Sequence, residues 1–88
     1  MPDRVVITGG AGFVGSTIAF ELKRKFPRAD ITAFDNLKRR GSELNVSRLK
    51  RAGVRFIYGD VRQPSDLEAL APDLIIECSA EPSAQAGL

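Results

Sequence analysis

A short apolar run near the start of the chain is followed by three glycines spaced three residues apart. The run is VVIT at residues 5–8, and the glycines are Gly9, Gly12 and Gly15. Gly9 permits a sharp turn, Gly12 lets the backbone approach a phosphate closely, and Gly15 lets a following helix pack against the sheet. Free N–H groups and a partial positive charge at the start of that helix favour a pyrophosphate. The pattern therefore predicts a dinucleotide-binding loop.

A carboxylate follows at the distance that such a loop requires. Asp35 lies twenty residues after the last of these glycines, at the end of a second apolar run over residues 31–34. There it can accept hydrogen bonds from the adenosine ribose and repel a 2′-phosphate, which favours NAD over NADP. The alternative is an aspartate that only caps the loop. The cations Lys38, Arg39 and Arg40 come next, and they either neutralise a 2′-phosphate or form a solvated loop. We predict NAD, with NADP the less favoured cofactor.

Length and composition restrict the class of protein. The 88 residues make at most one small domain. A net charge of +2, from 13 basic and 11 acidic residues, does not indicate a nucleic-acid surface. One cysteine and no histidine predict neither a disulfide framework nor a metal site, and they favour a reducing, cytoplasmic compartment. No apolar run reaches the ~18 residues of a membrane span, and a strand begins at once without a leader.

Apolar periodicity and turn residues divide the chain into alternating strands and helices. Strands are predicted at residues 4–8, 30–34 and 54–58, and a fourth from residue 74. The first helix is predicted at residues 13–26, because apolar residues recur every four positions, at Val14, Ile18, Leu22 and Phe26.

Two shorter helices are predicted after the second and third strands. The first of them covers residues 43–51, with Leu44 and Leu49 in the core and Gly53 ending the helix. A capping box at residues 65–68 predicts the second, whose leucines 67 and 70 face inward.

Strands separated by helices predict right-handed crossovers and a Rossmann-type α/β fold, which is a parallel sheet with helices on both faces. With strand order 3-2-1-4, a ligand lies where the order reverses, at the carboxyl ends of the strands. Residues 9–14, Asp35, Asp60 and Ser79 fall at those ends. Residues 79–88 stop in a loop or a helix start. We expect a sheet truncated after about four strands, with residues 1–88 forming the N-terminal part of an NAD(P)-binding Rossmann domain and no substrate domain.

Four motifs in order resemble one family. They are TGGAGFVG at residues 8–15, FDNL at 34–37, GDVR at 59–62 and IIECSA at 75–80. Together they resemble the N-terminal third of the extended short-chain dehydrogenase/reductases that act on nucleotide sugars. The segment FDNLKRRG at 34–41, with Asn45 and Leu49 after it, is most similar to the CDP-paratose (tyvelose) 2-epimerases. UDP-glucose 4-epimerases and sugar-nucleotide dehydratases share most of the pattern.

The resemblance implies roles along the cofactor. Backbone N–H groups of Phe13 and Val14 would meet the pyrophosphate, and Asp35 and Asn36 would hold the adenosine ribose. Asp60 would accept from the adenine amino group with Val61 beside the ring, although an aspartate in an ordinary turn is the alternative. Ser79, Ala80 and Glu81 would line the path to the nicotinamide ribose. The predicted cofactor site comprises Gly9, Gly12, Phe13, Val14, Gly15, Asp35, Asn36, Lys38, Arg39, Asp60, Val61, Ser79, Ala80 and Glu81.

The catalytic pair of this family is not found in the sequence. The resemblance implies catalysis by a tyrosine base with a lysine four residues later. The single tyrosine of this sequence is Tyr58, and the residue four positions later is Arg62 instead of a lysine. Glu77 stands in the region where the family commonly has a histidine, and Cys78 fits a buried strand residue better than a reactive thiol. We therefore predict no catalytic residue within the chain.

The resemblance predicts the N-terminal segment of an NAD-dependent nucleotide-sugar epimerase. The alternatives are a non-enzymatic NAD(P)-binding or sensing module, and a dehydratase or reductase of the same family. A nucleotide sugar would bind only to a full-length protein. We also expect a homo-oligomer, because an apolar fourth strand would lack a neighbour on one side.

Overall fold

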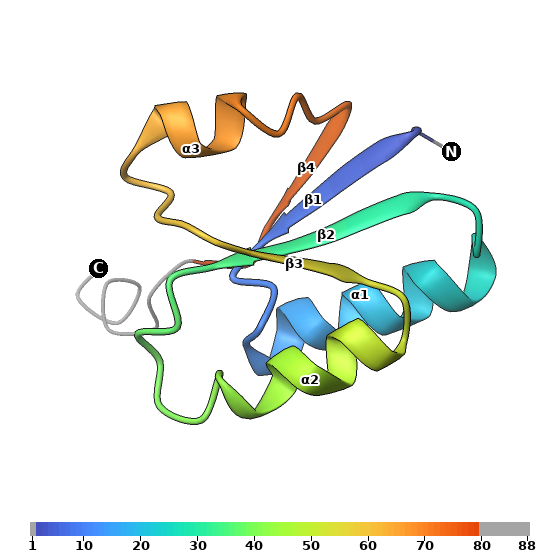
Figure 1. Ribbon diagram of the computed structural model, residues 1–88, viewed down its shortest axis with the longest axis horizontal. Coiled ribbons are helices and arrows are strands. Elements are labelled where there is room, and N and C mark those ends of the chain that lie inside the picture. Colours follow the sequence, from blue (N-terminus) through green and yellow to red (C-terminus); the bar gives the residue numbers. More distant parts are fainter. Residues whose placement is uncertain (1, 80–88) are drawn as a thin grey trace, which may run out of the picture.

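The computed structural model describes residues 2–79, which form a four-stranded parallel sheet in the order β3-β2-β1-β4 (Figure 1). The strands are β1 (Arg4–Thr8), β2 (Asp30–Asp35), β3 (Arg55–Tyr58) and β4 (Leu74–Glu77). Both the strand order and the Rossmann-type α/β fold predicted from the sequence are confirmed. Ala80 and Glu81, two of the predicted site residues, lie outside the described residues.

The register brings the carboxyl ends of the strands to one edge of the sheet. Thr8, the last residue of β1, lies opposite Phe34 of β2 on one side and Glu77 of β4 on the other. Asp35 of β2 lies opposite Tyr58 of β3. Residues that follow these strands therefore meet at the same edge, although they are far apart in the sequence.

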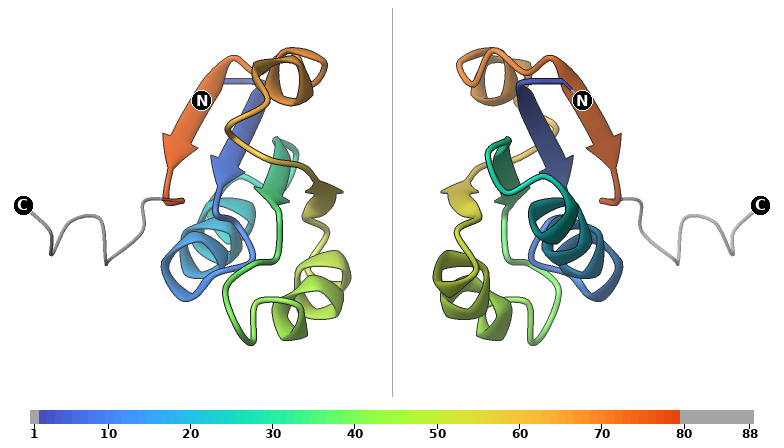
Figure 2. Two further views of the ribbon diagram at one scale, coloured as in Figure 1. Left: turned by 90° about the vertical axis from the view of Figure 1, so that its left-hand side faces the viewer. Right: turned by 90° about the vertical axis from the view of Figure 1, so that its right-hand side faces the viewer.

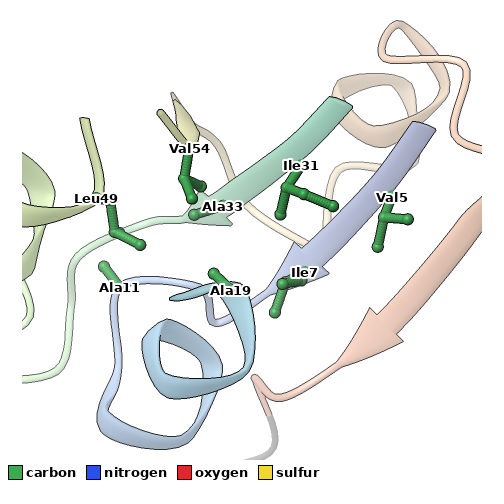
Figure 3. Close-up of a cluster of buried hydrophobic side chains, with 8 residues drawn as sticks. All are labelled: Val5, Ile7, Ala11, Ala19, Ile31, Ala33, Leu49 and Val54. Carbon is green, nitrogen blue, oxygen red and sulfur yellow. The ribbon is translucent and has the colours of Figure 1, made fainter. Parts of the chain in front are cut away.

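Helices cover both faces of the sheet, as predicted. On one face lie α1 (Phe13–Lys25) and α2 (Leu44–Arg51), and on the other lies the short α3 (Pro64–Glu68) (Figures 1 and 2). The main core fills the space between β1, β2 and the first two helices (Figure 3). Its buried members are Val5, Ile7, Ala11, Ala19, Ile31, Ala33, Leu49 and Val54. None of the helices among residues 2–79 has the length and apolar character needed to cross a membrane.

Helix α2 is terminated by Gly53, as predicted from the sequence, and this helix end explains why β3 starts one residue later than predicted. Gly53 adopts φ 85° and donates to the carbonyl of Lys50 at 3.1 Å, while Val54 donates to the carbonyl of Leu49 at 3.0 Å. This is a Schellman motif, and Leu49 and Val54 supply its apolar contact in the core. Since the cap uses the Val54 amide, the third strand begins at Arg55 instead of residue 54.

Two expectations about α1 and α2 are wrong. The first helix ends at Lys25, and Phe26 is its C-cap at φ −128° because the following Pro27 disfavours helical geometry at that residue. Leu44, expected in the core, is 72% exposed because it is the first residue of α2, with Glu43 as the N-cap.

The capping box expected in α3 is also wrong. Gln63 is the N-cap and Pro64 occupies the first helical turn, where its missing N–H costs nothing. Ser65 therefore lies inside the helix and does not cap it. Leu67, in the helix, and Leu70, two residues after its end, are half-buried, so neither is a fully buried core residue.

Candidate functional site

A cleft of about 470 Å³ lies at the carboxyl ends of the strands, where the strand order reverses between β1 and β4. Nine of the predicted site residues line it: Gly9, Gly12, Asp35, Asn36, Lys38, Arg39, Asp60, Val61 and Ser79. Five lining residues were not predicted: Ser42, Gly59, Arg62, Glu77 and Cys78. Phe13, Val14 and Gly15 do not line the cleft. The segments that β1, β2, β3 and β4 lead into thus converge on one opening.

Close contacts within the protein require glycine at two positions of the loop, Gly9 and Gly15. Gly9 has φ 67°, a left-handed conformation that favours glycine. A Cβ at Gly9 would also overlap the carbonyl of Cys78, the residue that follows β4. A Cβ on Gly15 would overlap the carbonyl oxygen of Gly9, so this glycine lets the first turn of α1 sit against the loop. At Gly12 the nearest atom to a Cβ would be that same carbonyl oxygen, at 3.3 Å, and Gly12 faces the cleft.

The first turn of α1 presents unpaired N–H groups. Gly12 is the N-cap, without a side-chain cap and without an acidic residue in the first turn. Ser16 donates the first hydrogen bond of the helix, from its N–H to the Gly12 carbonyl at 2.9 Å. The three preceding amides, of Phe13, Val14 and Gly15, have no acceptor among residues 2–79, as is usual at the start of a helix. The side chain of Phe13 is 84% exposed. Phe13 and Val14 do not line the cleft themselves, but their free amides directly follow Gly12, which does.

Asp35 ends β2 with its carboxylate held by two backbone amides. One oxygen accepts the N–H of Ala11 and the other the N–H of Leu37, both at 2.9 Å. Leu37 has φ 58°, which is strained for a leucine, and its contact with Asp35 supports that conformation. Each carboxylate oxygen can accept a further hydrogen bond. Asp35 therefore caps the loop, as the alternative interpretation held, and still lines the cleft.

Asp60 is bound by a cation that the sequence analysis did not place in the site. The Nη2 atom of Arg62 lies 2.8 Å from its Oδ2, and the Arg62 amide donates to Oδ1 at 2.9 Å. Hydrogen bonds from Arg62, with a contribution from Asn36, hold the pKa of the Asp60 carboxyl well below its usual range. The spacing of two residues between Asp60 and Arg62 was the sequence signal for this pair.

Glu77 connects the ends of β1 and β4. Its Oε1 accepts the hydroxyl of Thr8 at 2.7 Å, and it accepts both the amide, at 2.7 Å, and the hydroxyl of Ser79. Burial opposes ionisation of Glu77, but the hydrogen bonds from Ser79 and Thr8 outweigh burial and lower its pKa. Burial and the Glu77 charge raise the pKa of Cys78, so its thiol stays protonated. Glu77 thus fixes the turn that carries Ser79 into the cleft.

The charges around the cleft are balanced. Lys38, Arg39 and Arg62 supply three cations, against the carboxylates of Asp35, Asp60 and Glu77. Tyr58 is 70% exposed at the end of β3 and is not among the described residues that line the cleft. The arrangement suits a ligand with an anionic centre near α1 and neutral hydrogen-bonding groups near Asp35 and Asp60.

The fold and this loop define a nucleotide-binding domain of Rossmann type. A model of the NAD dependent epimerase/dehydratase family matches residues 5–87, so the chain belongs to this family. The family expected from the sequence motifs is therefore confirmed, and NAD is the cofactor after which the family is described.

Individual relatives match the chain over most of its length. It is 39% identical over 69 residues to the CDP-paratose 2-epimerase of Salmonella typhi, a match that covers 76% of this chain and 20% of that protein. It is 30% identical over 84 residues to the UDP-glucose 4-epimerase of Mycoplasma genitalium, covering 91% of this chain and 24% of that protein.

A solved structure shares the fold. The UDP-glucose-4-epimerase from Stenotrophomonas maltophila with bound NAD and formylated UDP-arabinopyranose gives a TM-score of 0.77 at 27% identity, covering 96% of this chain and 26% of that one. The chain thus spans between 20% and 26% of these relatives, less than the predicted third.

Proposed function

We propose that this chain is the NAD-binding N-terminal segment of a nucleotide-sugar epimerase. The observation that carries the proposal is that the free amides at the start of α1 directly follow Gly12, which lines the same cleft as Asp35. Gly12 adds support, because it lines the cleft and a Cβ there would meet one protein atom, the Gly9 carbonyl oxygen at 3.3 Å. The absence of a side chain at Gly12 lets a ligand in the cleft approach the backbone closely.

In this proposal each part of NAD meets a different strand end. The pyrophosphate accepts hydrogen bonds from the Phe13 and Val14 amides, and Asp35 accepts from the adenosine ribose hydroxyls. Asp60 accepts from the adenine amino group beside Val61. Asp35 repels a 2′-phosphate, so NAD is preferred over NADP although Lys38 and Arg39 are near. Asn36 and Ser79 complete the described part of the site.

The chain binds the cofactor and does not perform the proton transfer. NAD supplies the hydride acceptor in this family, and the sugar hydroxyl needs a separate base. Tyr58, on the far edge strand β3 and outside the cleft lining, is not that base. We place the base, the nucleotide-sugar site and the choice between epimerase and dehydratase chemistry in the longer protein that the relatives exemplify.

Edge strand β4 supports a proposal of self-association. Among the described strands β4 pairs only with β1, and its Leu74 and Ile75 are 40% and 45% exposed. Open N–H and C=O groups beside apolar side chains form a template for a further strand.

Titration of the 88-residue chain with NAD, followed by amide chemical shifts, tests the cofactor proposal. We expect shifts concentrated at Gly12, Phe13 and Val14, and a dissociation constant in the high micromolar to millimolar range, about 4 to 6 kcal/mol, because contacts from later strands are missing. NADP should bind more weakly than NAD. Shifts confined to residues away from the cleft would contradict the proposed site.

A further inference from the structure

The apex of the glycine loop is held by side chains from two other elements. Ala11, which is fully buried, donates its N–H to Oδ2 of Asp35 at 2.9 Å and accepts at its carbonyl from Nδ2 of Asn45 at 2.7 Å. Asp35 comes from the end of β2 and Asn45 from the first turn of α2. Both polar groups of one loop residue are thus fixed from outside the loop.

The orientation of the Asn45 amide is itself determined. Its Oδ1 accepts from Nη1 of Arg48 at 3.3 Å, and the Arg48 guanidinium lies 5.5 Å from the centre of the Phe20 ring of α1. Arg48 can only donate and the Ala11 carbonyl can only accept. A flipped amide would lose both hydrogen bonds, so Nδ2 must face the loop.

This contact fixes the peptide just before the first free amide. The peptide between Ala11 and Gly12 is held at both ends, since its carbonyl accepts from Asn45 and its N–H donates to the Gly9 carbonyl at 3.0 Å. The next N–H belongs to Phe13, which has no acceptor among residues 2–79. With glycine on either side of Ala11, the backbone has little intrinsic preference for this geometry.

We propose that Asn45 is a positioning residue for the pyrophosphate. By anchoring the Ala11 carbonyl, it orients the Phe13 and Val14 amides before the ligand arrives, so that the loop pays little ordering cost on binding. The inference rests on the proposed function, because it takes the pyrophosphate as the group bound at those amides. Without Asn45, the buried carbonyl lacks its donor, and the 11–12 peptide rotates to find water.

The test compares Asn45→Ala and Asn45→Asp with the parent 88-residue chain. The aspartate keeps the shape of the side chain, removes the donor and adds a negative charge. Ser47→Asp adds the same charge to an exposed position of the same helix and is the matched control. Amide titrations with ADP and with adenosine separate the pyrophosphate from the nucleoside. Amide exchange at Gly12 without ligand reports on the loop itself.

Both Asn45 variants should bind ADP about 3- to 10-fold more weakly, which is the worth of one hydrogen bond, while adenosine binding stays unchanged. Gly12 exchange should quicken in both, and Ser47→Asp should behave as the parent. Parent-like ADP affinity and Gly12 exchange in a folded Asn45→Asp chain would overturn the inference and leave the proposed function intact. A parent chain that binds no ADP at its Phe13 and Val14 amides would overturn both.

Discussion

Replacing Asp35 with alanine should cost stability as well as cofactor affinity. The change removes the acceptor of two backbone amides at 2.9 Å, one of them on the fully buried Ala11 and the other on Leu37 with φ 58°. An unsatisfied buried donor costs about 1–3 kcal/mol, and the partly exposed Leu37 contact adds about 0.5–1.5 kcal/mol. We therefore expect a loss of about 2–4 kcal/mol, in a chain of this size whose total is about 4–13 kcal/mol.

Thermal unfolding followed by circular dichroism measures this loss. For a domain of this length, about 2–4 kcal/mol corresponds to a fall in Tm of roughly 10–25 °C. Asp35→Asn is the matched control, because its one remaining carbonyl oxygen can keep one of the two amides while the charge that repels a 2′-phosphate is gone. It should lose about half as much stability as the alanine variant and should narrow the preference for NAD over NADP.

A Tm for Asp35→Ala within a few degrees of the parent would refute the reasoning from these two contacts. An unchanged ratio of NAD to NADP affinity in Asp35→Asn would separately remove Asp35 from the ribose site.

Three further predictions concern the loop, the turn after β4 and the open edge. Gly15→Ala should lower Tm because its Cβ collides with the loop, whereas Gly12→Ala should unfold near the parent Tm and bind NAD less tightly, as calorimetry can show. The folded-state pKa of Glu77 is lowered from 4.5, so the stability that its charge contributes is present above pH ~4.5 and is lost as the pH falls through the folded-state pKa. Glu77→Gln should therefore make the free energy of unfolding depend less on pH below ~4.5. Ile75→Lys should shift sedimentation toward monomer, and a parent chain that is monomeric at high concentration would contradict association through β4.

The strand order could be predicted because each strand is a distinct apolar run followed by a helix signal. Alternating elements allow few topologies once crossovers are right-handed, and the glycine spacing fixes which strand is central. The positions of Asp35 and Asp60 at one edge of the sheet follow from that order alone. The cleft was therefore predictable in outline.

Side-chain partners were less predictable, for physical reasons. Asn45 meets Ala11 across 34 residues, and Glu77 meets Thr8 across 69, so neither pair has a local pattern. The error at Leu44 has a different origin: helical side chains lean toward the preceding turn, and a residue at the start of a helix has no preceding turn to pack against. Local spacing shows which side chains can do chemistry, while tertiary register decides which of them meet.

The hydrogen bond from Ala11 to Asp35 couples cofactor preference to the shape of the loop. In the proposed site, Asp35 faces the ribose and also holds the amide of Ala11, so selection at this position acts on both properties together. Lys38 and Arg39 already line the same cleft and supply positive charge for a 2′-phosphate. A change to NADP would therefore not need new cations. It would need a neutral residue that still accepts the Ala11 N–H, which favours asparagine over alanine at position 35.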